Sequence, residues 1–134
     1  MARVAVVAVT VDVAVRWIDL DALGHVNNAV YLNYLEEARD RLLAAALGAA
    51  FAHVVIARVE IDYRQEIPRG IPQVTVTAAV ESVGTSSIRT VEEIRLTDGT
   101  LSATSRTVNV MCAAGGRSSR PLVDAERAAL LNSG

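Results

Sequence analysis

The segment DLDALGHVNNAVYLNYLEEARDRLL, residues 19–43, joins a polar loop to an amphipathic helix. Its first ten residues include two aspartates, a glycine, a histidine and two asparagines, which is more polar chemistry than a turn requires. From Ala29 to about Leu47 the apolar residues recur every three or four positions, which is the period of one helix face. The residues on that face are Tyr31, Tyr34, Leu35, Ala38, Leu42 and Ala45.

Both ends of this helix carry recognisable end signals. Asn27 or Asn28 can cap the helix by accepting hydrogen bonds from its first backbone N–H groups. Gly48 suits the other end, where a glycine commonly stops a helix. The polar loop is therefore expected to lie against the helix N-terminus, where free N–H groups and the helix dipole favour negative charge.

Most of the remaining chain alternates apolar and polar residues with the period of β-strands. Residues 3–17 form the first such run, and one of its faces consists of Val7, Val9, Val11, Val13, Val15 and Trp17. Turn signals such as Asp98-Gly99 separate four further runs, at about 55–63, 74–81, 88–96 and 100–112. A loop followed by a short terminal helix or tail is expected over 113–134.

The order of one strand, one long helix and four strands predicts an α+β fold. Consecutive strands with tight turns favour an antiparallel sheet, here of five strands, packed against the single long helix. The sequence contains no βαβ alternation, phosphate loop or internal repeat. We expect a single domain over 1–134. Because one helix covers only part of a five-stranded sheet, we also expect a homodimer or homotetramer.

Composition argues against several classes of protein. The chain has 13 basic and 15 acidic residues and a formal net charge of -2, so it lacks the basic surface that binds nucleic acid. Cys112 is the one cysteine, which rules out an intramolecular disulfide, and we expect it to be a buried, inert thiol. No run reaches the roughly 18 apolar residues of a membrane helix. We therefore expect a cytoplasmic protein that contacts no membrane.

The pattern D-x-D-x-x-x-H-V-N-N-x-x-Y-x-x-Y-x-E-x-x-R, which begins at Asp19, resembles the signature of hot-dog-fold acyl thioesterases, in the branch of 4-hydroxybenzoyl-CoA thioesterase. The HVNN segment is also similar to plant acyl-ACP thioesterases. The resemblance covers nearly the whole chain and implies a hot-dog fold, in which a five-stranded antiparallel sheet wraps around one long helix. It also implies hydrolysis of an acyl thioester, with CoA as part of the substrate and with no cofactor or metal.

The resemblance also assigns individual residues. Asp21 falls on the catalytic aspartate of both branches, and Gly24 falls on the glycine of the hydroxybenzoyl-CoA branch. His25 falls on the histidine of the plant pattern. That pattern has an asparagine where this sequence has Leu23, which weakens a plant-type Asn/His network and leaves Asp21 as the catalytic carboxylate.

Thioester hydrolysis suits these residue types. A carboxylate such as Asp21 can attack the carbonyl carbon or activate water to do so. The backbone N–H of Asn28, with Asn27 beside it, can stabilise the developing oxyanion at the helix N-terminus. Gly24 lets the backbone approach the ligand without a Cβ in the way. His25 can hold water, orient Asp21 or contact the thioester.

Further side chains complete the expected substrate site. Tyr31, one turn into the helix, is expected in the core and can also line the acyl pocket. Arg69 and Arg89 lie in or near predicted loops and are candidates to bind the CoA phosphates. The resemblance places Thr85 and Ser86 at the site of a neighbouring subunit.

Other polar residues are expected to have structural roles. Asp19 is expected to be a turn residue or a solvated carboxylate. Glu36 and Arg39 match the family pattern, and we expect a salt bridge or structural anchoring from them. His53 is expected at the surface or in packing.

Three alternative functions stay open. An acyl-ACP thioesterase is the nearest, although the near-neutral charge lacks the basic excess expected for docking an acidic carrier. A hot-dog hydratase or dehydratase would use an Asp/His pair on a differently spaced motif, which is absent. A non-catalytic acyl-CoA binding domain would bind the same ligand without turnover.

Overall fold

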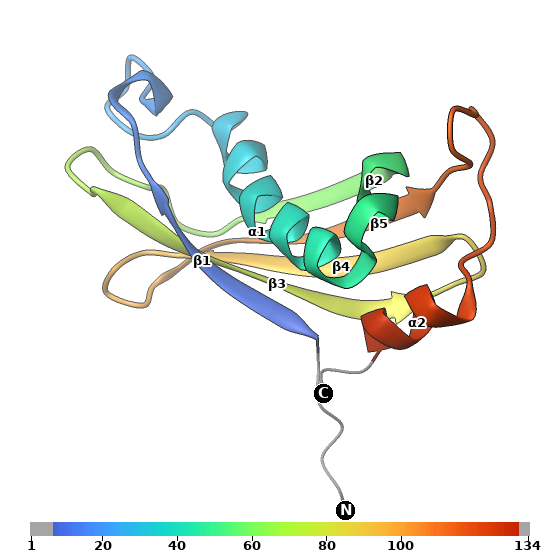
Figure 1. The fold of residues 1–134 in the computed structure, drawn as a ribbon. Coiled ribbons are helices and arrows are strands. Elements are labelled where there is room, and N and C mark those ends of the chain that lie inside the picture. The colour runs from blue at the N-terminus through green and yellow to red at the C-terminus, as the bar shows by residue number, and fades with distance from the viewer. Residues whose placement is uncertain (1–6, 132–134) are drawn as a thin grey trace, which may run out of the picture.

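A computed structural model describes residues 7–131 of the protein. Within that range five strands form one antiparallel sheet with the order β1-β3-β4-β5-β2 (Figure 1). The strands are β1 (Ala8–Ala14), β2 (Val54–Tyr63), β3 (Gln73–Val83), β4 (Ser87–Arg95) and β5 (Leu101–Met111). The helices are α1 (Val30–Leu47), α2 (Asp124–Leu131) and two 3-10 helices, η1 (Trp17–Asp19) and η2 (Gly48–His53). The predicted α+β arrangement is confirmed.

The first strand is shorter than the alternation in the sequence predicts. β1 ends at Ala14, and Trp17 lies in η1 with 87% of its surface exposed. The chain leaves the sheet here because the Asp19 carboxylate accepts a hydrogen bond from the backbone N–H of Arg16 and closes a turn. Residues 3–6 of the predicted strand, and residues 132–134 of the predicted terminal helix or tail, lie outside the described residues.

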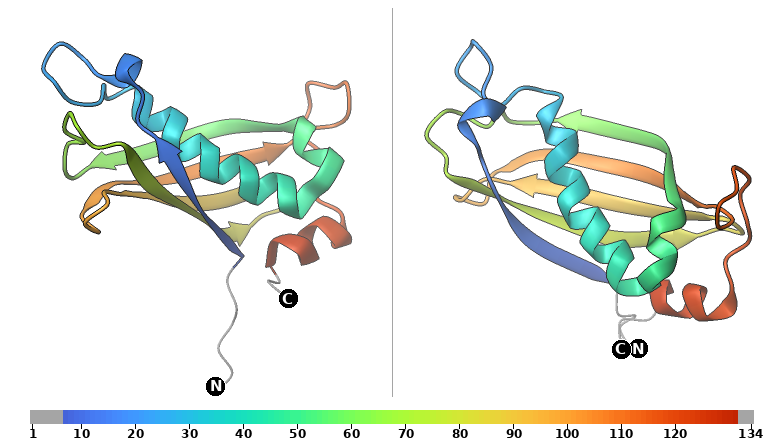
Figure 2. Two further views of the ribbon diagram at one scale, coloured as in Figure 1. Left: turned by 60° about the vertical axis from the view of Figure 1, so that its left-hand side comes forward. Right: turned by 45° about the horizontal axis from the view of Figure 1, so that its top comes forward.

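The core lies between α1 and one face of the sheet. α1 crosses this face over β1, β3 and β4, so the sheet curves around it (Figure 2). The central apolar residues of α1 are buried as predicted, but Ala45 is exposed and Leu43 is buried in its place. The last turn of α1 lies against η2 and α2 rather than over the sheet, which turns its buried side toward Leu43 and Leu47. Cys112 is half-buried rather than fully buried.

A polar cluster is buried beneath the middle of α1. The Arg39 guanidinium lies 3.5 Å from the Glu92 carboxylate, and both side chains are almost fully buried. The hydroxyls of Ser105 and Thr107 donate hydrogen bonds of 2.6 and 2.7 Å to the same Glu92 oxygen, Oε1. Arg39 thus has the structural role expected for it, whereas Glu36 is exposed on the other side of the helix.

Candidate active site

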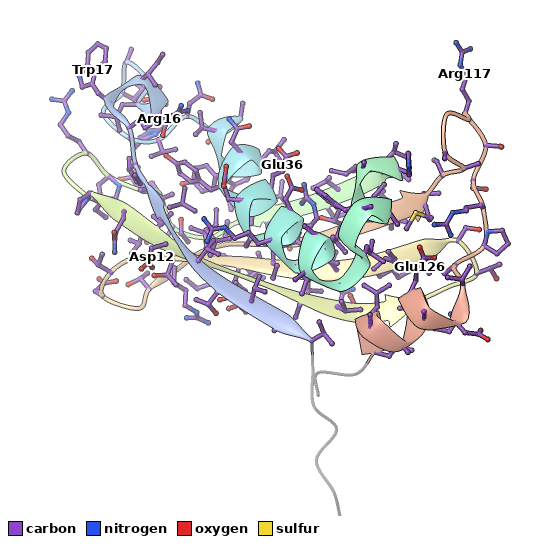
Figure 3. The ribbon with its side chains drawn as sticks, in the orientation of Figure 1. Asp12, Arg16, Trp17, Glu36, Arg117 and Glu126 are labelled. Atoms are coloured by element: carbon purple, nitrogen blue, oxygen red, sulfur yellow. The ribbon has the colours of Figure 1, made fainter. Side chains whose placement is uncertain are left out.

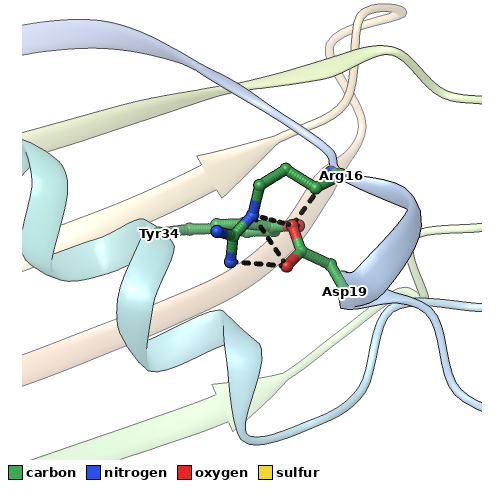
Figure 4. Close-up of polar contacts among 3 residues, drawn as sticks. All are labelled: Arg16, Asp19 and Tyr34. Atoms are coloured by element: carbon green, nitrogen blue, oxygen red, sulfur yellow. Dashed lines mark hydrogen bonds and ion pairs between the residues drawn. The ribbon is translucent and has the colours of Figure 1, made fainter.

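The polar loop before α1 is anchored by Asp19. Asp19 lies in the turn η1, as one of its two predicted roles has it, but only 1% of it is exposed, so the alternative of a solvated carboxylate is wrong. Figure 4 shows its carboxylate between Arg16 and Tyr34, and the Tyr34 hydroxyl donates to it over 2.7 Å. Its backbone carbonyl also accepts from the Asn27 N–H. Asp19 is buried because the folded helix places the Tyr34 hydroxyl against the loop. A buried carboxylate needs such hydrogen-bond donors.

These donors also set the ionisation of the anchor. Burial alone would raise the pKa of Asp19, but hydrogen bonds from Arg16 and Tyr34 outweigh it and hold this pKa below its usual value. Burial and the bond to Asp19 raise the pKa of the Tyr34 hydroxyl. Asp19 is therefore a stable anion that fixes the start of the loop to α1.

Residues 21–25 form a tight hairpin loop. The Asp21 N–H donates to the His25 carbonyl over 2.9 Å, and the Gly24 N–H donates back to the Asp21 carbonyl over 3.2 Å. Gly24 has a φ of +88°, which matches a three-residue hairpin loop with a left-handed residue at its end. The loop is paired to the chain before β3, where the Arg69 N–H donates to the Gly24 carbonyl.

Asp21 and His25 form a side-chain pair. His25 Nδ1 lies 3.2 Å from Asp21 Oδ2 and 3.3 Å from the Val26 carbonyl oxygen. Both neighbours accept hydrogen bonds, so the proton of a neutral imidazole is assigned to Nδ1 and the lone pair to Nε2. The other oxygen of Asp21 accepts a hydrogen bond of 2.8 Å from the Leu23 N–H, which holds the carboxylate in place.

The N-terminus of α1 follows directly. The Asn27 side chain accepts a hydrogen bond of 2.9 Å from the Ala29 N–H and closes a turn just before the helix. The N-cap of α1 is Ala29, and no side chain caps it, so the prediction of Asn27 or Asn28 as the cap is wrong. The Asn28 N–H has no hydrogen-bond partner among residues 7–131. The Asn28 carbonyl accepts a hydrogen bond of 2.9 Å from the Tyr63 hydroxyl. One unpaired donor therefore remains at the positive end of the helix dipole.

A cavity of about 270 Å³ opens beside this helix end. Its walls include His25, Asn28, Tyr31, Tyr63 and Glu66. The rings of Tyr31 and Tyr63 meet edge to face with centroids 5.0 Å apart. Asp21 does not line the cavity, whereas its neighbour His25 does. The His25 side chain therefore lies between the Asp21 carboxylate and the cavity.

Tyr63 and Glu66 are the site residues that the sequence analysis did not identify. Glu66 Oε2 lies 3.9 Å from His25 Nε2, on the side away from Asp21. Both residues come from the end of β2 and the chain after it, about forty positions from the motif. The only local signal was an aromatic residue at the end of an alternating strand, which is too common to indicate a site.

The predicted site residues divide into two groups in space. The residues from Asp21 to Tyr31, together with Arg69, gather at the N-terminal end of α1. Thr85, Ser86 and Arg89 lie at or beside the β3–β4 turn, at the other end of the 11-residue strand β3 (Figure 1). Eleven strand residues span roughly 35 Å, so one chain does not bring the two groups together.

Comparisons with known proteins agree with this geometry. A family model described as the thioesterase-like superfamily matches residues 15–130. A thioesterase from Thermus thermophilus, solved in complex with coenzyme A and Zn, is 35% identical with a TM-score of 0.83, and the match covers 96% of this chain and 98% of that one. A predicted thioesterase from Bacillus stearothermophilus is 29% identical with a TM-score of 0.82, covering 92% and 93%.

A third solved structure, a thioesterase-superfamily protein from Jannaschia sp. CCS1, is 28% identical with a TM-score of 0.79 and coverage of 90% and 79%. No curated protein matches the chain significantly. The chain therefore belongs to the thioesterase-like superfamily, whose members are thioester hydrolases with the hot-dog fold.

Residues 7–131 contain neither a cluster of metal ligands nor a membrane-spanning helix. No group of three or more His, Cys, Asp or Glu side chains there is placed to hold a metal ion. No helix in the same range combines the length and the apolar composition needed to cross a membrane.

Proposed function

We propose that the protein hydrolyses an acyl-CoA thioester to a free carboxylic acid and CoA, at the cavity beside the N-terminus of α1. The observation that carries the proposal is that His25 and Asn28 line one cavity, with the Asp21 carboxylate 3.2 Å from His25 Nδ1. The complex of the Thermus thioesterase with coenzyme A supports CoA as the carrier. A cytoplasmic location stays a prediction.

The unpaired N–H of Asn28 is the proposed oxyanion donor. Negative charge develops on the carbonyl oxygen as the thioester becomes tetrahedral. An N–H at a helix N-terminus stabilises that charge with a fixed dipole, which requires little rearrangement during the reaction. The hydrogen bond from the Ala29 N–H to the Asn27 side chain holds the turn that leads into the helix.

The Asp21–His25 pair is the proposed base. Asp21 orients the imidazole through Nδ1, which leaves Nε2 to take a proton from water in the cavity. The resulting hydroxide bonds to the carbonyl carbon. The tetrahedral intermediate then breaks its C–S bond, and the imidazolium returns the proton to the departing thiolate. Asp21 acts here through His25, which differs from direct attack by the carboxylate.

The two tyrosines form the proposed start of the acyl pocket. Tyr31 and Tyr63 enclose the inner part of the cavity with an edge-to-face pair. The Tyr31 hydroxyl accepts a hydrogen bond from the Ile67 N–H, so its ring is held in place. Gly24 leaves open space at the hairpin loop, since an added Cβ there would meet no atom within 4 Å.

A second copy of the chain is proposed to complete the site. β2 is an edge strand that pairs with β5 on one side, and it exposes Val55, Ile56 and Tyr63. Exposed strand edges of this kind pair readily with another chain. Antiparallel pairing of two β2 edges would bring the partner's β3–β4 turn toward the cavity, which accounts for Thr85, Ser86 and Arg89 lying far from it within one chain.

Thiol release from a panel of aliphatic and aromatic acyl-CoAs tests the proposal. Asp21→Asn keeps the shape of the side chain but removes its charge, and His25→Gln removes the base. We expect each variant to lower kcat by about 10²–10⁴-fold. Asp12→Asn, on an exposed residue of β1, is the matched control and should keep full activity. Full activity in Asp21→Asn would overturn its assignment. Saturable acyl-CoA binding without turnover would favour the binding-domain alternative.

Mixed assemblies test the contribution of the second copy. Protomers carrying Asp21→Asn are mixed with protomers carrying Thr85→Ala and Ser86→Ala, after each has been shown to lose activity. If the site takes residues from two chains, each mixed dimer holds one intact site and thiol release returns. Failure to recover activity in a mixture shown to contain mixed dimers would place each site within one chain.

A further inference from the structure

A second hollow of about 500 Å³ lies beside the active-site loop and shares no lining residue with the cavity. Its walls include Arg16, Trp17, Leu20, Arg69, Ile71 and Pro72. These residues come from the turn before the loop and from the chain that enters β3. The hollow is therefore a groove between the two segments that hold the active-site loop.

Trp17 is presented on a well-held turn. It begins η1, and the Asp19 carboxylate fixes that helix through hydrogen bonds from the Arg16 backbone, the Arg16 side chain and the Tyr34 hydroxyl (Figure 4). Nevertheless the indole is 87% exposed, and Figure 3 shows it pointing away from the fold. A large flat ring exposed on a fixed turn is suited to stacking on a ligand.

The charges of this groove favour an anion. The lining residues include the guanidinium groups of Arg16 and Arg69 and no carboxylate; the Arg16 group is paired with Asp19, so Arg69 supplies the positive charge for a ligand. Within residues 7–131 Arg69 makes no ion pair or side-chain hydrogen bond, so its donors are available. Another hollow, of about 570 Å³ on the outer face of the sheet, differs because the carboxylates of Glu60, Asp62 and Glu93 lie among its walls beside Arg64 and Arg106.

The combination of the exposed Trp17 indole and the Arg69 guanidinium matches an adenine nucleotide. Purine bases stack on aromatic side chains, and guanidinium groups bind phosphate oxygens through paired N–H donors. The groove is also next to the proposed reaction centre. The backbone of Arg69 is hydrogen-bonded to Gly24, and Pro68 pairs with His25. The hairpin loop between these contacts is open at Gly24, where an added Cβ would meet no atom within 4 Å.

We propose that this groove binds the phosphorylated adenosine end of CoA, with Trp17 stacked on the adenine and Arg69 on the phosphates. The inference rests on the proposed function, because it gives the carrier of that substrate its binding site. It assigns Trp17 to the adenine ring and Arg69 to the phosphate groups of CoA.

The fluorescence of the full-length protein tests this assignment directly, since Trp17 is the one tryptophan in the chain. Adenosine 3′,5′-bisphosphate and CoA are each titrated into the wild type. We expect a saturable change in Trp17 emission with both ligands. Arg69→Ala should weaken their binding by about tenfold or more, as expected for the loss of hydrogen bonds to a charged group. Arg41→Ala, on an exposed arginine of α1, is the matched control and should bind as the wild type does.

Kinetics then separate the nucleotide site from the reaction centre. Trp17→Leu should raise KM for acyl-CoA by roughly tenfold, and the rise should exceed any fall in kcat. Trp17→Phe, which keeps a ring for stacking, should restore most of the loss. Acyl-pantetheine lacks the nucleotide, so its KM should respond to neither substitution.

The possible failures are distinguishable. Unchanged emission on addition of CoA, while the wild type still releases thiol, would overturn the groove and leave the proposed function standing. Emission that changes with protein concentration but not with nucleotide would mean that a second copy covers Trp17, which also overturns it. Bisphosphate binding that does not compete with acyl-CoA would indicate a site for a separate nucleotide and would contradict the CoA assignment. Nucleotide binding without turnover of any acyl-CoA would remove the proposed function instead.

Discussion

The hydroxyl of Tyr63, at the end of β2, donates a hydrogen bond of 2.9 Å to the carbonyl oxygen of Asn28, at the start of α1. This bond joins the edge strand to the peptide next to the proposed oxyanion donor. The ring of Tyr63 also packs on Tyr31, so its hydroxyl is directed by a second contact. Tyr63 is therefore a positioning residue: it holds the backbone that carries the donor.

Tyr63→Phe removes this hydroxyl and keeps the ring. We expect kcat for acyl-CoA hydrolysis to fall by about tenfold, the equivalent of one ordinary hydrogen bond, with KM little changed. The amide resonance of Ala29, whose N–H belongs to the peptide of the Asn28 carbonyl, should shift in an NMR spectrum. Thr10→Val is the control, because it removes a hydroxyl from an exposed residue of β1 and should leave the Ala29 resonance in place. Wild-type kcat in Tyr63→Phe would contradict the positioning role.

Asp19→Asn tests the anchor of the loop. At neutral pH we expect a loss of about 1.5–3 kcal/mol in the free energy of unfolding, since hydrogen bonds to a buried charge are replaced by weaker ones. The folded-state pKa of Asp19 is lowered, so its contribution is complete above the unfolded value of about 3.9 and is lost as pH falls through the folded value. Urea unfolding of both proteins should therefore show a difference that is constant near pH 7 and shrinks below about pH 4. A difference that grew with acidity would contradict this account.

Arg39→Met tests the buried pair beneath α1. The substitution leaves the Glu92 carboxylate buried without its cation, and we expect the free energy of unfolding to fall by about 3–5 kcal/mol. Adding Glu92→Gln should recover much of this loss, because the amide oxygen still accepts from Ser105 and Thr107 but carries no charge. Denaturant unfolding of the single and double variants makes the measurement. If the double variant were no more stable than Arg39→Met alone, the unpaired charge of Glu92 would not be the cause of the lost stability.

Gly24→Ala tests the hairpin loop that carries Asp21. The backbone of Gly24 has a φ of +88°, and nothing lies within 4 Å of an added Cβ, so the cost is conformational rather than steric. We expect a loss of about 1–2 kcal/mol in the free energy of unfolding. Ala22→Gly, two positions earlier in the same loop, serves as the comparison and should change stability by less. Equal stability of Gly24→Ala and the wild type, measured by thermal or urea unfolding, would show that the loop relaxes to another turn.

The sequence alone determined the elements and the local motif of this protein. Periods of two and of three to four residues depend on which side of a strand or helix each side chain occupies, so they can be read without coordinates. The loop before α1 was recognised from its crowded polar residues and from its resemblance to the thioesterase motif. That motif is local, since Asp21, Gly24, His25 and Asn27 interact with neighbours only a few positions away. The long alternating runs and the Asp98-Gly99 turn likewise placed the five strands in order.

Only the tertiary structure decided which distant residues join that motif. Asp19 is buried because α1 folds back to offer the Tyr34 hydroxyl, and Tyr63 reaches Asn28 because β2 ends beside the helix N-terminus. Trp17 is exposed because a turn ends β1 before it. The alternation of apolar and polar residues does not predict where that turn begins. Such contacts join residues that are not local in the chain, and their energies depend on burial and geometry that exist only after the sheet has closed around α1.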